Sequence, residues 1–178
     1  MFELFKTFFQ IGFFTIGGGY AMIPLIEQKV VDEKHWVDHD ELLDLIAVAQ
    51  SCPDDLVIGA DTVVVYDGAI LGKPADEADA ARMLRTLSGK THEVFTGVCL
   101  IRAGKAETFY ARTQVTFYPL SEPEIEAYVA TGEPMDKAGA YAIQGGAGAF
   151  VEAIDGEFDN VVGFPTEEVK EMLQEFGM

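Results

Sequence analysis

The spacing of hydrophobic and polar residues changes near residue 53, and beyond it the pattern is that of a folded α/β chain. Residues 56–65 (LVIGADTVVV) form an apolar, β-branched run of strand length, bounded by acidic residues on both sides. Asp67-Gly68 is a turn signal, so residues 69–71 are predicted to return as a short second strand. The sequence therefore predicts a β-hairpin at the start of this region.

Alternating helices and strands are predicted from residue 74 to the end. Pro74, Asp76 and Glu77 start a helix, whose apolar residues are spaced for one buried face: Ala80, Met83, Leu84 and Leu87. Two strands follow, at 94–102 and 108–118. Ser121 and Glu124 have the spacing of a capping box, which predicts a helix through Tyr128. A last helix is expected over residues 166–176, which completes a soluble α/β domain.

The first part of the chain has a different distribution of charged and apolar residues. Residues 7–26 contain no formal charge, and as a helix these twenty residues would span about 30 Å, the thickness of a bilayer core. The glycines at 17–19 and Pro24 interrupt that helix. Two interpretations remain open: membrane contact through residues 7–26, or a buried hairpin or core helix of a soluble domain.

The amino-acid composition excludes some classes of function. The 178 residues include 12 Lys+Arg and 30 Asp+Glu, so the formal net charge is −18. This length corresponds to one domain, or one domain with an appendage. The acidic balance argues against nucleic-acid binding, although a local group of cations or a bound metal still permits free nucleotides. Cys52 and Cys99 lie far apart, which predicts reduced thiols in a cytoplasmic protein and no zinc site.

Several polar residues are candidates for chemistry. Asp61 interrupts an apolar strand, either as a structural acid that accepts backbone hydrogen bonds or as a metal ligand or general base at the carboxyl end of the strand. Lys73 precedes a helix and suits a phosphate, although surface lysines are common. Asp136 and Lys137 are either a surface ion pair or site residues. His92 is either catalytic or, more often at such a position, structural.

Four stretches follow one another within residues 54–177: DDLVIGADTVVVYDGAILGKP, LSGKTHEVFTGV, ATGEPMDKAGAYAIQGGAGAFV and NVVGFP. In this order they resemble the Maf (septum-formation) family of nucleotide pyrophosphatases. It implies a mixed sheet flanked by helices, and an enzyme that splits a nucleoside triphosphate into the monophosphate and pyrophosphate. It further implies a divalent cation, Mg²⁺ or Mn²⁺, a homodimer in the cytoplasm, and a link to arrest of cell division.

The same resemblance assigns roles to individual residues. It makes Asp61 the catalytic acceptor and the metal-site carboxylate, and Lys73 a phosphate contact. It places Asp136 and Lys137 near the substrate.

Two further residues bear on which nucleotide is used. Thr62, directly after the catalytic aspartate, and Gln144 in the AIQG stretch follow the pattern of the family branch that acts on dTTP and UTP. The resemblance therefore implies a dTTP/UTP pyrophosphatase.

Residues 1–51 resemble a different family. GGGYAMIPLI at 17–26 and ELLDLIAVAQS at 41–51 are similar to the amino-terminal start of chromate transporters. We therefore expect two parts: a chromate-transporter-like apolar helical fragment over 1–53, and an amino-terminally truncated Maf-like domain over 54–178.

The fusion predicts impaired catalysis. Maf proteins carry a Ser-x-Ser-Pro-Arg-Arg loop that clamps the triphosphate, whereas the first arginine of this chain is Arg82. Loss of a bidentate arginine–phosphate contact weakens substrate or transition-state binding. The alternative is a membrane-associated chromate-transporter-type fragment fused to an inactive nucleotide-binding domain.

Overall fold

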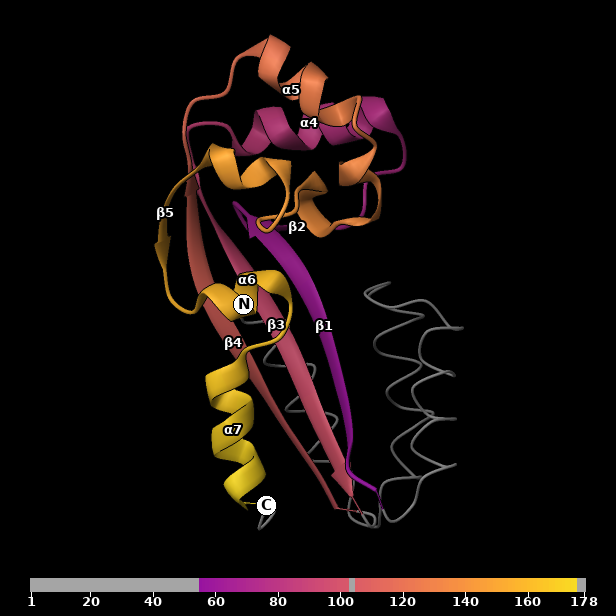
Figure 1. Ribbon diagram of the computed structural model, residues 1–178, viewed down its shortest axis with the longest axis vertical. Coiled ribbons are helices and arrows are strands. Elements are labelled where there is room, and N and C mark those ends of the chain that lie inside the picture. Colours follow the sequence, from indigo (N-terminus) through magenta and orange to yellow (C-terminus); the bar gives the residue numbers. More distant parts are fainter. Residues whose placement is uncertain (1–54, 103–104, 176–178) are drawn as a thin grey trace. The chain divides into compact units, whose positions relative to one another are not determined.

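The computed structural model describes residues 55–102 and 105–175 (Figure 1). Within them, residues 60–98 and 109–175 belong to one compact unit, and the other described residues belong to a second. Residues 1–54, which carry the apolar run and the chromate-transporter-like stretch, lie outside the described part. The predictions for that segment therefore stay predictions.

One five-stranded sheet organises the described residues, in the order β2-β1-β3-β4-β5. The strands are β1 (Val57–Tyr66), β2 (Ala69–Leu71), β3 (Thr91–Arg102), β4 (Lys105–Phe117) and β5 (Val151–Asp155). β1 pairs antiparallel with β2, β4 pairs antiparallel with β5, and Figure 1 shows β1 and β3 running in opposite directions. The sheet is antiparallel over the described residues, where the parallel pairs of the expected mixed sheet are not found. Parallel neighbours need a crossover of a dozen or more residues, whereas only two residues separate β1 from β2 and β3 from β4.

The hairpin at the sheet edge forms as its sequence predicts. Tyr66 pairs with Ala69, and the two residues between them, Asp67 and Gly68, have φ angles of 50° and 77°. Positive φ at both central residues is the backbone of a type I′ turn, whose twist matches that of the strands. This turn extends β1 to Tyr66, one residue beyond the predicted end.

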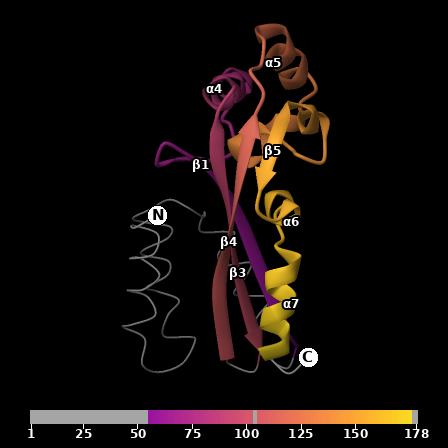
Figure 2. The same ribbon diagram turned by 90° about the vertical axis from the view of Figure 1, so that its left-hand side faces the viewer.

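Four α-helices and three 3₁₀ helices complete the described fold. They are α4 (Glu77–Leu87), α5 (Glu122–Val129), η3 (Glu133–Asp136), η4 (Ala138–Ala140), η5 (Gly146–Phe150), α6 (Phe158–Val162) and α7 (Thr166–Glu175). Asp76 caps α4 by accepting from the Asp79 N–H at 2.8 Å, and the predicted capping box of Ser121 and Glu124 is present at α5. Figure 2 shows β5, α6 and α7 following one another along the same side of β3 and β4. None of these described helices is both long and apolar enough to cross a bilayer.

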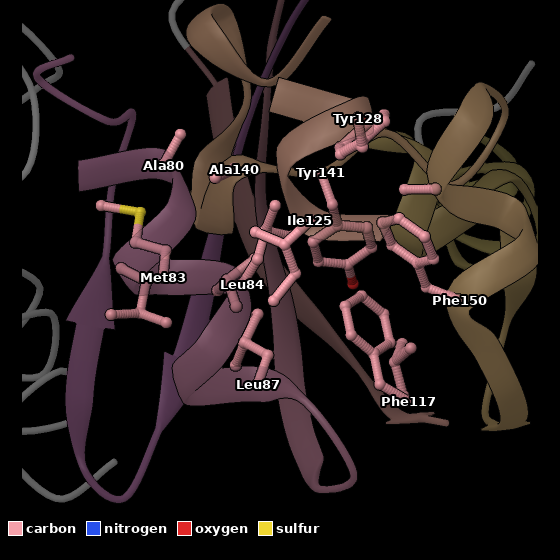
Figure 3. Packing of buried hydrophobic residues seen from close by; sticks show 14 of the residues in the cluster. Ala80, Met83, Leu84, Leu87, Phe117, Ile125, Tyr128, Ala140, Tyr141 and Phe150 are labelled. Carbon is pink, nitrogen blue, oxygen red and sulfur yellow. The ribbon is translucent and has the colours of Figure 1, made fainter. Parts of the chain in front are cut away.

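The hydrophobic core lies between α4, α5 and the sheet (Figure 3). The predicted face of α4 is buried, with Leu84 and Leu87 fully enclosed. These side chains pack in one cluster with aromatic residues from β4, α5 and the following loops: Phe117, Tyr128, Tyr141 and Phe150. Burial of a large apolar side chain contributes about 1.5–3 kcal/mol, so this cluster is the main source of stability for the unit.

His92 belongs to the core and has a structural role. Only 1% of it is exposed, its Nε2 lies 2.9 Å from the Tyr141 hydroxyl, and its ring meets the rings of Phe117 and Tyr141 edge-on at 5.0 and 5.4 Å. Burial lowers the pKa of His92 from 6.5 to about 4, because the charged imidazolium is poorly solvated there.

We expect the stability of the protein to depend on His92 in a defined pH window. The His92 side chain takes up its proton at a higher pH in the unfolded chain than in the folded chain. The contribution of neutral His92 to the free energy of unfolding is therefore complete above about pH 6.5. It is lost as the pH falls toward about 4 and amounts to about 3 kcal/mol in total. Urea unfolding of wild type and His92→Gln between pH 7.5 and pH 4.5 tests this. A variant that loses stability on acidification as steeply as wild type would contradict it.

Candidate active site

Strand β1 carries Asp61 and Thr62 at its middle. Side chains alternate along a strand, so Thr62 shares the core-facing side with Val64, and Asp61 lies on the opposite side, where it is exposed. Two expectations about Asp61 are therefore wrong. It is not at the carboxyl end of the strand, because β1 continues beyond it to Tyr66. It is also not a buried carboxylate inside an apolar strand, because its face of β1 is accessible.

The edge of β1 gives access to both residues. β2 pairs with β1 only from Val64 to Tyr66, and no other described strand pairs with β1 on that side. At the level of Asp61 and Thr62 this edge therefore has no strand partner within the described part of the chain. A ligand that approaches along the edge meets side chains of both faces, which is how two residues adjacent in sequence can serve one site.

Lys73, Asp136 and Lys137 lie near one another. The Gly139 N–H donates to the Gly72 carbonyl at 3.1 Å and thereby joins the loop after β2 to η4. Lys137 Nζ lies 2.7 Å from Asp136 Oδ2. That hydrogen bond lowers the pKa of Asp136, and the charge of Lys73 lowers it further. The sequence left open whether Asp136 and Lys137 are a surface pair or site residues; they are an exposed ion pair, and Lys73 is near enough to act on it.

Gln144 lies in a loop that is tied to the same short helix. The carboxylate of Glu133, the first residue of η3, accepts hydrogen bonds from the Gly146 N–H at 3.0 and 3.2 Å and from the Tyr128 hydroxyl at 3.1 Å. Tyr128 in turn accepts from the Ala142 N–H at 3.1 Å. The Gln144 side chain is exposed on this anchored loop.

Gly139 determines how closely η4 approaches β1. Its φ angle is +69°, and a Cβ at this position would lie 2.9–3.0 Å from the side chain of Val64. Only glycine combines this left-handed backbone with such close contact to a strand.

We expect Gly139→Ala to destabilise the protein by about 2–4 kcal/mol, through backbone strain and overlap with Val64. Gly132 provides a matched control, because its φ angle is +76° but nothing lies within 4 Å of an added Cβ. Gly132→Ala should therefore lose only about 1 kcal/mol, the strain alone. Urea unfolding of the two variants measures the difference, and equal losses would show that the contact with Val64 is unimportant.

A buried hydrogen-bond network behind Thr62 escaped the sequence analysis. Thr62 Oγ1 lies 2.8 Å from Thr96 Oγ1, and Thr96 Oγ1 donates to the Asn160 carbonyl at 3.0 Å. Asn160 Nδ2 donates to the Val94 carbonyl at 3.1 Å and to Thr113 Oγ1 at 3.0 Å. Two signals were available in the sequence. Thr96 places a hydroxyl two residues after Val94, on the same core-facing side of the strand, and Asn160 is the first residue of NVVGFP.

A shallow hollow of about 320 Å³ lies elsewhere on the sheet. Its lining residues are Val65, Tyr66, Asp67, Thr91, His92, Glu93 and Gln114. It includes none of the six candidate residues, and an ion pair between Glu93 and Arg112 borders it. The six candidate residues therefore lie outside this hollow.

The described residues suit a divalent cation only when it is shared with a substrate. They contain no group of three or more His, Cys, Asp and Glu side chains that could hold a metal by themselves. Asp61 nevertheless offers an accessible carboxylate on β1. Mg²⁺ is commonly bound by one or two carboxylates together with substrate phosphates, and a single exposed aspartate fits that arrangement.

The fold defines a class of protein: an α/β domain that carries an exposed aspartate on β1 and, as a separate feature, an exposed Asp136–Lys137 ion pair with Lys73 near it. Comparison with known families agrees, because residues 31–176 match the family described as Maf-like protein. The chain belongs to this family. The match begins at residue 31, within the part that the sequence analysis gave to a chromate-transporter-like fragment.

Curated relatives support the same assignment. The chain is 53% identical over 132 residues to a dTTP/UTP pyrophosphatase of Bacillus cereus strain AH820, an alignment that covers 74% of this chain and 69% of the relative. A dTTP/UTP pyrophosphatase of Bacillus anthracis is 52% identical with the same coverage. These findings do not support the alternative of a membrane-associated transporter fragment with an inactive domain.

Proposed function

We propose that this protein is a nucleoside triphosphate pyrophosphatase that hydrolyses dTTP and UTP to the monophosphate and pyrophosphate. The observation that carries the proposal is the 53% identity, over 132 residues, to a relative named dTTP/UTP pyrophosphatase. All six candidate residues lie within the part of the chain that matches the Maf-like family. A cytoplasmic homodimer is the accompanying proposal.

The chemistry proposed for the site divides between a carboxylate and two cations. Asp61 accepts a proton from a water molecule whose oxygen forms a bond to the α-phosphorus, while the bond from that phosphorus to the bridging oxygen breaks and pyrophosphate leaves. Lys73 and Lys137 neutralise phosphate charge that a chain of net charge −18 would otherwise repel. A divalent cation held by Asp61 and the substrate phosphates would supply further charge neutralisation.

Asp136 is proposed to position Lys137. The 2.7 Å ion pair fixes the direction of a flexible side chain, and its exposure leaves the ammonium accessible to a phosphate. Because the pair is exposed, its own contribution to stability is small and depends on salt. Substrate binding is therefore expected to weaken as the salt concentration rises.

Pyrophosphate release by the purified chain tests the proposed function. We expect release from dTTP and UTP with Mg²⁺ or Mn²⁺, and its loss when a chelator is added. GTP and dCTP are the comparison substrates. A folded chain that releases no pyrophosphate from any of them would contradict the proposal, as would equal release from all four. Gel filtration with light scattering checks the proposed dimer.

A further inference from the structure

The start of α7 is attached to the residue before α6 through one carboxylate oxygen. Glu157 Oε1 accepts hydrogen bonds from the Thr166 hydroxyl at 3.2 Å and from the Glu167 N–H at 3.1 Å. Glu167 lies in the first turn of α7, where N–H groups have no acceptor within the helix. Figure 2 shows α7 directly following α6 along one side of the sheet. The Glu157 carboxylate therefore caps α7 from outside that helix.

Glu157 is itself fixed to the sheet. Its carbonyl accepts a hydrogen bond from the Thr113 hydroxyl of β4 at 2.9 Å, and Thr113 is fully buried. Burial shields that hydrogen bond from competing water. If the contact between Glu157 and α7 is lost, the helix is therefore the part that moves.

Glu157 also meets a second carboxyl group, that of Glu168 in α7. Glu157 Oε2 and Glu168 Oε2 are both shielded from water, and no donor of the described residues reaches either atom. The side chains of Glu157 and Glu168 nevertheless lie within hydrogen-bond contact of each other. An ionised carboxylate can only accept, whereas a protonated carboxyl group carries one O–H donor. One proton between the two side chains supplies the donor that the pair lacks.

The charges that surround this pair are mostly negative. Within the described residues they come from both helices that meet there, and they are Asp159 of α6 with Glu167, Lys170 and Glu171 of α7. Lys170 is paired with Glu167 at 2.5 Å, so its charge is largely taken up by that carboxylate. Asp159 Oδ2 accepts from the Thr166 hydroxyl at 2.6 Å and leaves little of that single hydrogen for Glu157. These negative surroundings favour a protonated carboxyl group over a second ionised one.

The two pKa values of the pair move in opposite directions, as a shared proton requires. The hydrogen bond with Glu157 raises the pKa of Glu168, and partial burial and the charge of Glu171 raise it further. Burial opposes any lowering of the pKa of Glu157, but the hydrogen bonds from Glu168 and from the Glu167 N–H outweigh it, and this pKa is lowered. Glu168 therefore holds the proton, and Glu157 is the charged acceptor.

We propose that Glu157 and Glu168 share one proton that attaches α7 to the start of α6, and that loss of this proton as the pH rises releases the first turn of α7. Without the proton, two negative charges face each other at oxygens that water does not reach. Because the pKa of Glu168 is raised in the folded chain, its contribution to stability is complete below the ordinary glutamate value of 4.5 and is lost as the pH rises through the raised pKa. No nucleotide takes part, so this device is independent of the proposed function.

Proton loss and helix release can be followed in the full chain between pH 5 and pH 8, above the isoelectric point of about 4.3. By NMR, we expect the Glu168 carboxyl carbon still to be titrating above pH 5. The protection of the Glu167 and Val169 N–H groups against hydrogen exchange, relative to an unfolded peptide at each pH, should fall about tenfold over the same step, because one unit of pKa shift is a tenfold change in an equilibrium constant. The Leu84 N–H of α4 is the internal reference and should not lose protection, because the His92 contribution is complete at high pH.

Two reciprocal variants supply the missing donor at every pH. In Glu168→Gln the amide can donate to Glu157 without a proton from solution. In Glu157→Gln the amide oxygen still accepts from the Glu167 N–H, while the amide nitrogen donates to Glu168. We expect both variants to keep at pH 8 the protection that wild type has at pH 5. Glu171→Gln is the matched control, because it removes the same charge from α7 but supplies no donor to the pair, and it should lose protection as wild type does.

A Glu168 carboxyl group that is fully ionised at pH 5 would overturn the proposal, and this result needs only the wild-type chain. Unchanged protection of the α7 N–H groups in wild type between pH 5 and pH 8 would overturn it too. So would a Glu168→Gln or Glu157→Gln protein that loses as much protection as wild type. A Glu171→Gln protein that loses none would assign the effect to the general charge of α7 and not to the shared proton.

Discussion

Replacement of Asp61 by asparagine is expected to reduce pyrophosphate release from dTTP and UTP by at least about 100-fold. The amide has nearly the same shape as the carboxylate but cannot accept a proton from the attacking water, and loss of a general base commonly has an effect of this size. It also removes the negative charge that would hold a divalent cation beside the substrate phosphates. Because Asp61 is exposed, the substitution leaves the core intact. Initial rates at saturating metal give the comparison.

Asp67→Asn is the matched control for this experiment. Asp67 follows the same strand but lies in the β1–β2 turn, where its φ angle of 50° is one that asparagine also adopts readily. This variant should keep the wild-type rate while changing net charge by the same amount. An Asp61→Asn protein that retains the wild-type rate would remove Asp61 from the chemistry, and an Asp67→Asn protein that loses it would point to a general charge effect.

Phe117→Ala is expected to have the largest effect on stability, a loss of about 3–5 kcal/mol. The Phe117 ring is fully buried, and its centroid lies 4.9–6.1 Å from the rings of His92, Tyr141 and Phe150. Truncation leaves a cavity that these rings cannot fill without disturbing their edge-to-face contacts. A domain of this size is commonly stable by only 5–15 kcal/mol, so the variant should unfold at a much lower urea concentration.

The residue that directly follows β4 provides the control for this change. Tyr118 has 48% of its surface exposed, and its backbone N–H donates to the Phe150 carbonyl at 2.8 Å whatever its side chain is. Tyr118→Ala should therefore lose about 1 kcal/mol or less. Similar losses for the two variants would mean that the aromatic cluster is not the centre of the core.

Local patterns in the sequence were sufficient for most of the described elements. Asp67-Gly68 specified the hairpin because both residues tolerate positive φ, and Ser121 with Glu124 specified the start of α5 because they satisfy its free N–H groups. The buried face of α4 followed from the spacing of its apolar residues. In each case the cause lies within a few residues of its effect.

The site was less predictable because its geometry depends on distant contacts. The alternation of side chains along β1 puts Asp61 on an exposed face, although the apolar run suggested burial. The neighbourhood of Lys73 and Asp136 depends on the glycine contact with Val64, across more than seventy residues of sequence. Thr96 and Asn160 were missed because their hydrogen bonds join residues that are far apart in the sequence and meet only in the folded chain.

Thr96 is hydrogen-bonded both to Thr62 and to the Asn160 carbonyl, so the order in which these positions mutate matters in evolution. If Thr96 is replaced first by an apolar residue, the Thr62 hydroxyl loses its partner at 2.8 Å, and later changes at position 62 no longer disturb that hydrogen bond. If position 62 changes first, Thr96 keeps its bond to the Asn160 carbonyl and remains under selection for the packing of β3 against α6. Lineages of this family should therefore show asymmetric dependence between the two positions. Ancestral reconstruction followed by measurements on the intermediate sequences would reveal it.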